Sequence, residues 1–185
     1  MQGICAFSPG KHADYLSDES KLPGVADSIS FPTSEEDVAR IVRDLGERGV
    51  DITLQGGRTG LSGGAVPRGG HVMNLSRMNE ITGARYAGGD ELIVSLQPGV
   101  PLSALAEKVW HDDRTVTATG VRSTARSNDN GGGRRYFFPP DPTETTASLG
   151  GIVSCNAAGC RSYGYGSARR FEQIEYLRGM RACRA

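Results

Sequence analysis

The sequence LQGGRTGLSGG, at residues 54–64, constrains the fold more than any other stretch of the chain. Five of its eleven residues are glycine, and it follows directly on the apolar run VDITL at residues 50–54. Glycine adopts backbone angles that other residues avoid, and it lets another group approach the backbone closely. We therefore expect a buried strand to end here in a tight loop that contacts either a ligand or another piece of backbone.

Three kinds of phosphate-binding loop can be compared with this stretch. A P-loop needs Gly-Lys-Ser/Thr, but Leu61 and Ser62 follow Gly60. A Rossmann loop opens a helix, whereas this loop continues through GGAVPRGG into the apolar run HVMNL at residues 71–75. A nest of backbone N–H groups needs no helix and can bind an anion. A glycine-rich surface loop or hairpin without a ligand remains an alternative at this point.

The clearest helix signal follows the sequence FPTSEEDVARIVRDLGERG. Thr33 and Glu36 fit a capping box, and Gly49 is suited to the C-terminal end. Apolar residues recur at helical spacing and predict a helix over 35–48 with one buried face. That face consists of Val38, Ile41, Val42 and Leu45.

The rest of the chain divides into short predicted elements. Strands are expected in VDITL, HVMNL and ELIVSLQPGV, and an amphipathic helix in PLSALAEKVW. Its apolar side comprises Leu102, Leu105, Ala106 and Val109. Residues 1–30 are expected to be irregular, residues 115–136 to form a long loop, and FEQIEYLRGM to begin another strand.

Composition excludes several classes of function. Lys plus Arg equals Asp plus Glu, at 21 each, so no overall charge favours nucleic acid. No apolar run is long enough to span a bilayer, and the N-terminal residues lack a signal-peptide pattern. The four cysteines form no CxxC pair, so we expect no metal site and reduced thiols in a cytoplasmic protein.

A second stretch of small polar residues and glycines changes the interpretation of the loop. PPDPTETTASLGG at residues 139–151 is followed by NAAGCRSYGYGS at residues 156–167. This composition is too polar for a core. Two distant segments of this kind suit a long polar ligand with a diphosphate, bound between two lobes mainly by backbone groups.

These segments match a known family. YLSDES, FPTSEEDV, QGGRTGLSGGAVP, MNLSRMNEI, QPGV, FFPPDPTETTASLGG and NAAGCRSYGYGS occur in this order over most of residues 15–170. The chain resembles the FAD-linked oxidase superfamily with its PCMH-type, or vanillyl-alcohol-oxidase-type, FAD-binding domain. It looks most like the D-lactate dehydrogenase and glycolate oxidase flavoprotein branch. The resemblance implies an α+β fold of two small lobes, 1–103 and 104–185, with small mixed or antiparallel sheets and a cofactor crevice between them.

The resemblance also implies which residues bind FAD. The pyrophosphate loop would comprise Gln55, Gly56, Gly57, Arg58, Thr59, Gly60, Leu61 and Ser62. The flavin and its ribityl chain would lie near Pro140, Asp141, Thr143, Ser148, Gly150, Gly151, Ser154, Asn156, Gly159, Tyr165 and Gly166. Arg58 stands where covalent members often have histidine, so non-covalent FAD is expected.

The implied reaction is hydride transfer from a 2-hydroxy acid, such as D-lactate or glycolate, to FAD. No catalytic base is identified, because His12, His71 and His111 lie outside the cofactor motifs. Arg161 could meet a substrate carboxylate or serve a surface role. The resemblance further suggests C-terminal truncation, with the substrate domain missing or on a separate subunit. The alternatives are a non-catalytic flavin-binding fragment and the flavin domain of a UDP-sugar reductase.

Overall fold

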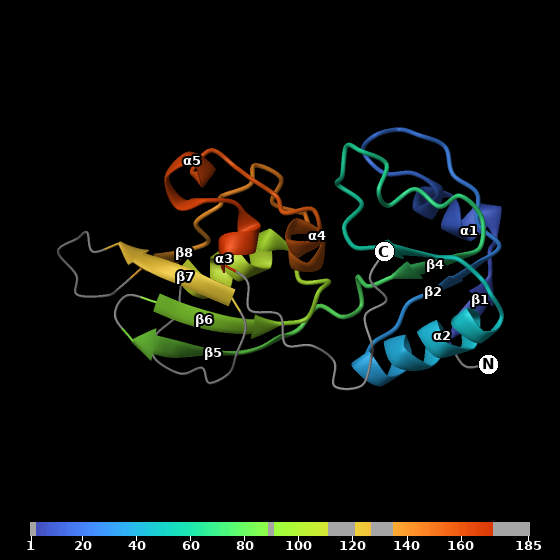
Figure 1. Ribbon diagram of the computed structural model, residues 1–185, viewed down its shortest axis with the longest axis horizontal. Helices are drawn as coiled ribbons and strands as arrows, with labels where there is room; N and C mark the ends of the chain where they lie inside the picture. Colours follow the sequence, from blue (N-terminus) through green and yellow to red (C-terminus); the bar gives the residue numbers. More distant parts are fainter. Residues whose placement is uncertain (1–2, 89–90, 111–120, 127–134, 172–185) are drawn as a thin grey trace.

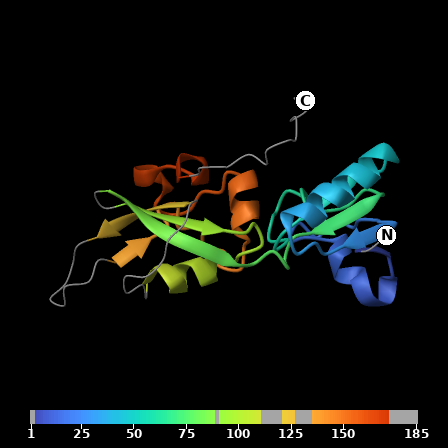
Figure 2. The same ribbon diagram turned by 90° about the horizontal axis from the view of Figure 1, so that it is seen from below.

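The computed structural model describes residues 3–88, 91–110, 121–126 and 135–171. The chain forms two sheets that lie side by side along its long axis, each with its own helices (Figure 1). A view turned by 90° keeps the two sheets apart (Figure 2). This mixed arrangement of helices and strands is the α+β fold expected from the sequence.

The first sheet contains four short strands in the order β1-β2-β4-β3. Their bounds are Ile4–Ala6 for β1, Ser28–Ser30 for β2, Ile52–Gln55 for β3 and His71–Asn74 for β4. β1 runs antiparallel to β2, whereas β2 and β3 run parallel to β4. The sheet is therefore mixed. The glycine-rich loop connects the adjacent parallel strands β3 and β4, so it leaves the sheet at the carboxyl end of β3.

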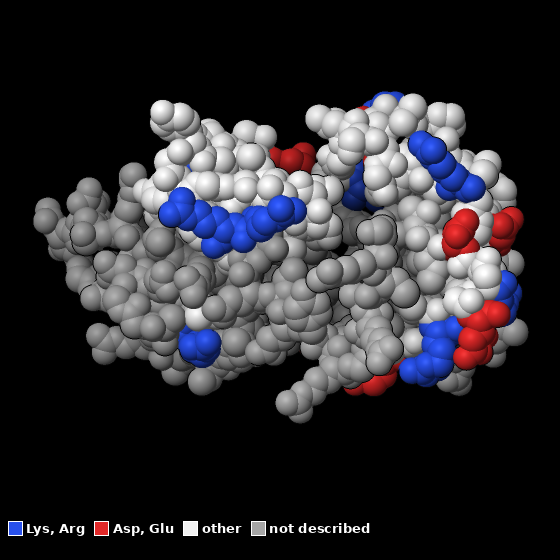
Figure 3. All heavy atoms as spheres, in the orientation of Figure 1, with Lys and Arg blue, Asp and Glu red and all other residues white. Residues whose placement is uncertain are grey.

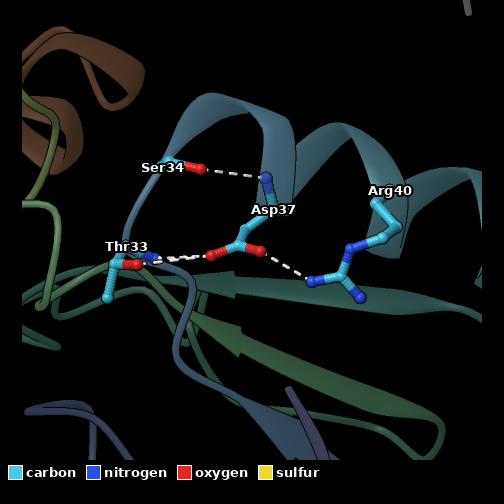
Figure 4. A network of polar contacts seen from close by, with 4 residues as sticks. All are labelled: Thr33, Ser34, Asp37 and Arg40. Atoms are coloured by element: carbon cyan, nitrogen blue, oxygen red, sulfur yellow. Dashed lines mark hydrogen bonds and ion pairs between the residues drawn. The ribbon is translucent and has the colours of Figure 1, made fainter. Parts of the chain in front are cut away.

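Helix α2 (Glu35–Glu47) begins one residue later than the predicted capping box. Ser34 is the N-cap, and its hydroxyl accepts a hydrogen bond from the Asp37 backbone at 3.2 Å. Thr33 instead donates to the Asp37 carboxylate, which also pairs with Arg40 at 2.6 Å (Figure 4). Gly49 has a φ of +63° just beyond the helix, as expected of a C-terminal glycine.

The predicted apolar face of α2 packs on the first sheet. Ile41 and Leu45 are buried against Met73 of β4, and partly buried side chains extend the cluster. These include Val38, Val42, Val50 and Ile52. The opposite side of α2 carries both acidic and basic residues (Figure 3). The prediction for this helix is confirmed.

Two expectations for the first lobe were wrong. β3 is an edge strand rather than a buried one, and the Leu54 side chain is 57% exposed. Residues 1–30 are not irregular throughout, because they contain β1, β2, helix α1 (Pro9–His12) and a 3-10 helix, η1 (Ala13–Leu16). β1 was hidden from sequence analysis because it has only three residues, all at least partly exposed.

The second sheet is antiparallel, in the order β5-β6-β7-β8. The strands are β5 (Ile81–Gly88), β6 (Glu91–Leu96), β7 (Val121–Arg126) and β8 (Arg135–Phe137). Because β5 and β6 belong to this sheet, the two sheets divide between β4 and β5, and not after residue 103. The prediction of a long loop over residues 115–136 was also wrong in part, because β7 lies within this range and pairs with β6 and β8.

The second core lies between this sheet and its helices. Helices α3 (Leu102–Trp110) and α4 (Leu149–Ser154) contribute to it, as does the 3-10 helix η2 (Ala168–Phe171). Its buried residues include Leu92, Val94, Leu102, Leu105, Leu149 and Ile152. Ala106 is exposed, although the helical pattern placed it on the apolar side. The side chain of Val109 is not among those that the structure describes. The strand expected in FEQIEYLRGM lies outside the described residues, except for its first residue, Phe171, which is buried.

No helix within the described ranges combines the length and apolar character that crossing a membrane requires.

His71 is a buried histidine in the first sheet, as expected of a packing residue. Its side chain is fully buried, with Nδ1 2.8 Å from the Ser28 hydroxyl and Nε2 2.7 Å from the Ser30 hydroxyl. Burial, helped by the positive charge of Arg48, lowers the pKa of His71 to about 4. The imidazole is therefore neutral in the folded protein at neutral pH.

We expect His71 to lower the free energy of unfolding as the pH falls from neutral to about 4. The unfolded chain binds the proton with a pKa near 6.5, so acid favours unfolding in this window. The free energy of unfolding should decrease by about 3 kcal/mol from His71 alone. Urea titrations across this range, compared with those of His71→Gln, measure the effect. An equal pH dependence in both proteins would contradict it.

Candidate functional site

Gln55 anchors both ends of the glycine-rich loop. Its side chain is 2% exposed, and the amide nitrogen donates to the carbonyl oxygens of Tyr15 at 2.8 Å and Ala65 at 2.7 Å. The first of these carbonyls belongs to η1 and the second lies at the far end of the loop. Gln55 was expected to contact the cofactor, but its amide group is already used to hold the loop to the protein.

Asn74, at the end of β4, is a site residue that sequence analysis missed. Its side-chain nitrogen lies 3.4 Å from the Gly56 carbonyl oxygen, and its side-chain oxygen accepts from the Ser76 backbone at 3.0 Å. The side chain is 1% exposed. A buried polar residue at the carboxyl end of an apolar strand was the available signal.

The two glycine-rich segments meet at Ser148. The Gly57 backbone N–H donates to the Ser148 hydroxyl oxygen at 3.3 Å. A Cβ at Gly56 would lie 1.9 Å from that oxygen, and one at Gly57 would lie 2.9 Å from the Thr146 carbonyl oxygen. Side chains at these two glycines would therefore push the segments apart. Residues 56–57 and residues 146–148 are therefore in direct contact, and a ligand bound between the two glycine-rich segments stays a prediction.

Ser148 also caps helix α4. Its hydroxyl oxygen accepts from the Gly151 backbone at 3.3 Å, and the residue is 4% exposed. One buried hydroxyl thus serves a donor from each lobe. Gly150 approaches a different segment, because its backbone N–H donates to the Pro98 carbonyl oxygen at 2.8 Å.

Replacing Ser148 with alanine should destabilise the protein by about 1–2 kcal/mol, because the backbone N–H groups of Gly57 and Gly151 both lose their acceptor. Ser154→Ala is the matched control, since that exposed hydroxyl bonds only to Gly150 within the same helix. We expect the control to change stability by less than about 0.5 kcal/mol. Urea unfolding measures both variants. Faster hydrogen exchange at Gly57 in Ser148→Ala alone would locate the loss, and equal stability of the two variants would contradict it.

The QPGV turn, at residues 97–100, supports this junction and was not among the predicted site residues. Leu149 donates to the Val100 carbonyl at 2.7 Å, and Leu102 donates to the Ala147 carbonyl at 2.9 Å. A Cβ at Gly99 would lie 2.2 Å from the Leu75 carbonyl oxygen. The turn is therefore enclosed between the connection from β4 to β5 and the segment that carries Ser148.

Arg58 bends the loop toward the N-terminal segment. It adopts a left-handed φ of +57°, its guanidinium lies 4.7 Å from the Tyr15 ring centroid, and it donates to the Asp14 carbonyl. A hollow of about 250 Å³ lies beside it. The lining residues are Asp14, Ser17, Asp18, Glu19, Lys21, Gly57 and Arg58.

The central part of the loop offers free backbone donors. Among the described residues, the backbone N–H groups of residues 58–62 donate no hydrogen bond. Leu61 is 81% exposed, and Gly60 and Ser62 are also exposed. A glycine-rich turn with unpaired N–H groups and two nearby hydroxyls, Thr59 and Ser62, has the donor set that a diphosphate requires.

Most of the remaining predicted residues lie in or beside α5 (Ser162–Tyr165) and its flanking turns. Gly159 packs on the Pro140–Asp141 backbone, and a Cβ there would lie 1.9 Å from the Asp141 carbonyl oxygen. The side-chain oxygen of Asn156 accepts from the Ser167 hydroxyl at 2.7 Å. In both views α5 lies farther from the first lobe than α4 does (Figures 1 and 2). Thr143 and Ser154 are exposed, Tyr165 packs edge-on against Phe137, and Gly166 has a φ of +97°.

Left-handed backbone angles concentrate in these same segments. The non-glycine residues with positive φ in the described ranges are Lys21, Arg58, Asp141 and Asn156. Three of them were predicted to bind the cofactor. Such angles cost free energy and tend to occur at functional sites, although Asp and Asn tolerate them better than most residues.

The candidate acid–base residues are largely occupied. His12 lies in a cluster of aromatic rings, 5.4 Å from Phe7 between centroids, and accepts from the Ser8 backbone. Arg161 pairs with Asp141 at 3.0 Å. His111 lies outside the described residues. Within the described ranges, no three His, Cys, Asp or Glu side chains gather as potential metal ligands.

Comparison with known proteins identifies the family. The sequence profile of the family described as "FAD binding domain" matches residues 26–133, which is more than half of the chain. The chain belongs to the FAD binding domain family. FAD is the cofactor of this family, and the backbone donor set of residues 58–62 fits its diphosphate.

Relatives of this FAD-binding domain include named dehydrogenases. It is 34% identical over 170 residues to a D-lactate dehydrogenase from Anaerostipes hadrus, covering 90% of this chain and 30% of that protein. It is 30% identical over 146 residues to a D-2-hydroxyglutarate dehydrogenase from Xanthomonas citri, covering 78% of this chain and 26% of that protein. The chain therefore spans less than a third of these relatives' length.

The fold is that of PCMH-type FAD-binding domains. The structure of 6-hydroxy-D-nicotine oxidase from Arthrobacter nicotinovorans superposes with a TM-score of 0.62 at 19% identity. The match covers 92% of this chain and 32% of that chain. The expected fold class and the predicted family are both confirmed.

Proposed function

We propose that this chain is the FAD-binding portion of a flavin-dependent oxidoreductase that oxidises a 2-hydroxy acid of the D-lactate type. The observation that carries the proposal is the run of free backbone N–H groups at residues 58–62 of the glycine-rich loop, which is held to the second glycine-rich segment at Ser148. The names of the relatives, D-lactate dehydrogenase and D-2-hydroxyglutarate dehydrogenase, support the substrate class.

Within this proposal, the backbone N–H groups of residues 58–62 hold the diphosphate. Residues 148–151 lie beside the bound cofactor, and the remaining predicted residues line the same side of the cofactor site. When bound, FAD supplies a hydride acceptor, while the protein binds it, orients it and excludes water. The attachment is non-covalent at residue 58, because the Arg58 side chain offers no nucleophile and contacts Tyr15 and Asp14 instead.

The test is direct. The purified protein is titrated with FAD, followed by flavin fluorescence and absorption, and the loaded protein is then mixed with D-lactate, glycolate and D-2-hydroxyglutarate under anaerobic conditions. Bleaching of the flavin by one of these acids supports the complete proposal. FAD binding without bleaching would contradict the proposed activity of this chain, and failure to bind FAD would contradict the cofactor site.

A second candidate is a flavin-binding unit that does not itself catalyse oxidation. It is favoured because neither described histidine is available as a base: His71 is buried between two serines, and His12 lies among aromatic rings. Oxidation of a hydroxy acid needs a base for the hydroxyl proton. The catalytic base and the carboxylate-binding cation would then come from a further domain or a separate subunit. Mixing experiments with such a partner would restore flavin bleaching.

We also propose a reducing compartment such as the cytoplasm. Cys5, Cys155 and Cys160 are exposed and unpaired within the described part of the chain. Exposed thiols of this kind persist where disulfides are kept reduced.

A further inference from the structure

A tight turn at Asp18–Lys21 lies against the glycine-rich loop. The Lys21 N–H donates to the Asp18 carbonyl at 3.0 Å, so Glu19 and Ser20 occupy the two central positions of a β-turn. The Asp18 carboxylate accepts from the Ser20 N–H at 2.9 Å and reinforces the turn. Residues 18–20 of this turn belong to the YLSDES motif, to which no function in the glycine-rich loop has yet been assigned.

The turn holds one particular peptide group of the loop. The Glu19 N–H donates to the Arg58 carbonyl oxygen at 3.2 Å. The described peptide bonds are all trans, and in a trans peptide the C=O and the following N–H point in opposite directions. The Thr59 N–H is therefore directed away from the turn. The preceding part of the loop shows the same relation, because Asn74 holds the Gly56 carbonyl while the Gly57 N–H reaches Ser148.

Two further contacts hold the turn and the preceding 3-10 helix η1 to the loop. The Asp18 carboxylate, in a residue 5% exposed, accepts from the Ala65 N–H at 3.4 Å. Burial raises its pKa, but hydrogen bonds from Ser20 and Ala65 outweigh this, so the pKa is below its usual value and the group stays ionised. Arg58 supplies the other contact through the Tyr15 ring and the Asp14 carbonyl.

The charges on the turn side of the loop also indicate that the diphosphate binds on the opposite side. Asp14, Asp18 and Glu19 line the hollow on the turn side, together with two cations, Lys21 and Arg58. The hollow therefore carries one net negative charge, which disfavours a diphosphate on that side. The anion-binding side of the Arg58–Thr59 peptide is therefore the side opposite the turn, to which the Thr59 N–H is directed.

We propose that the Asp18–Lys21 turn is a positioning element that sets the direction of the Arg58–Thr59 peptide, and so presents the Thr59 N–H to the diphosphate of FAD. Glu19 acts through its backbone N–H rather than its side chain. This inference rests on the proposed role of the loop, and deepens it by assigning a function to a segment outside the cofactor motifs.

The test compares Glu19→Pro with Glu19→Ala. Proline suits the second position of a β-turn, so this substitution removes the N–H while keeping the turn. Both variants lose the exposed Glu19–Lys21 ion pair, which makes alanine a matched control. We expect Glu19→Pro to bind FAD, and ADP as a diphosphate probe, about tenfold more weakly than Glu19→Ala. Crystal structures of both variants without ligand should show the Arg58 carbonyl displaced only in Glu19→Pro.

The outcomes separate the two proposals. Wild-type protein that binds neither FAD nor ADP contradicts the proposed role of the loop, while the ligand-free structures still decide the peptide direction. Equal affinities of the two variants, or an unmoved Arg58–Thr59 peptide in Glu19→Pro, overturn the inference. If Glu19→Pro does not fold, Asp18→Asn replaces it, because its amide nitrogen cannot accept from Ala65. Weaker ADP binding by that variant supports the inference, and unchanged binding overturns it.

Discussion

Replacing Gly57 with valine is expected to weaken FAD binding by about 10- to 100-fold while the protein stays folded. A Cβ at Gly57 would lie 2.9 Å from the Thr146 carbonyl oxygen and 3.3 Å from the Ser148 nitrogen. Both are backbone atoms, so the loop must move instead. That movement breaks the bond from Gly57 to Ser148 and displaces the free N–H groups that follow. The local cost of about 1–3 kcal/mol is of the size needed for this loss of affinity.

Gly64→Val is the matched control for this variant. Gly64 belongs to the same loop and is exposed, and a Cβ there would meet no atom within 4 Å. Flavin fluorescence titrations of the two variants should therefore differ strongly, and urea unfolding should show Gly57→Val to be less stable than Gly64→Val by about 1–3 kcal/mol. Normal FAD binding by Gly57→Val would show that the loop does not hold the diphosphate.

The second large effect is expected at Gly99, in the QPGV turn. Replacing it with alanine should lower the free energy of unfolding by about 3 kcal/mol. The new Cβ would lie 2.2 Å from the Leu75 carbonyl oxygen and 2.7 Å from that of Met78. These atoms belong to the connection between the two sheets, and Gly99 also donates to the Met78 carbonyl at 2.7 Å. No rotation of a side chain can relieve the conflict.

Gly46→Ala provides a control of opposite sign. Gly46 lies in α2, is exposed, and a Cβ there would meet no atom within 4 Å. Alanine is favoured over glycine in a helix, so this variant should gain about 0.5–1 kcal/mol. Urea titrations of both variants test the pair. A Gly99→Ala protein as stable as the wild type would show that the QPGV turn can shift freely.

The sequence predicted those elements whose pattern is local. The helical spacing of Ile41 and Leu45 and the stop at Gly49 sufficed for α2, and the motifs sufficed for the fold family. β5 escaped because irregular pairing between Ile81 and Gly83, and between Tyr86 and Gly88, interrupts its alternation. The exposed position of Leu54 could not be read either, because an edge strand and a central strand can share one apolar sequence.

At the candidate site, residue types were predicted better than their tasks. Composition predicted that both glycine-rich segments would contact one ligand, but not that they would contact each other at Ser148. The burial of Gln55 and the role of Asn74 were not predicted either, because both depend on carbonyl groups brought in from other segments. The contact from Glu19 to Arg58 joins two backbone groups, so no side-chain pattern could have indicated it.

The pairing of β2 with β4 has a consequence for how the chain folds. Ser28 and His71 are partners in adjacent parallel strands, yet they lie 43 positions apart in the sequence. β5 and β6, by contrast, are consecutive and antiparallel. Closing a long loop is slow, so the hairpin should acquire protected amides before the first sheet does. During synthesis, the N-terminal strands must wait for His71–Asn74 to emerge, and until then β2 lacks the neighbour that covers its parallel edge.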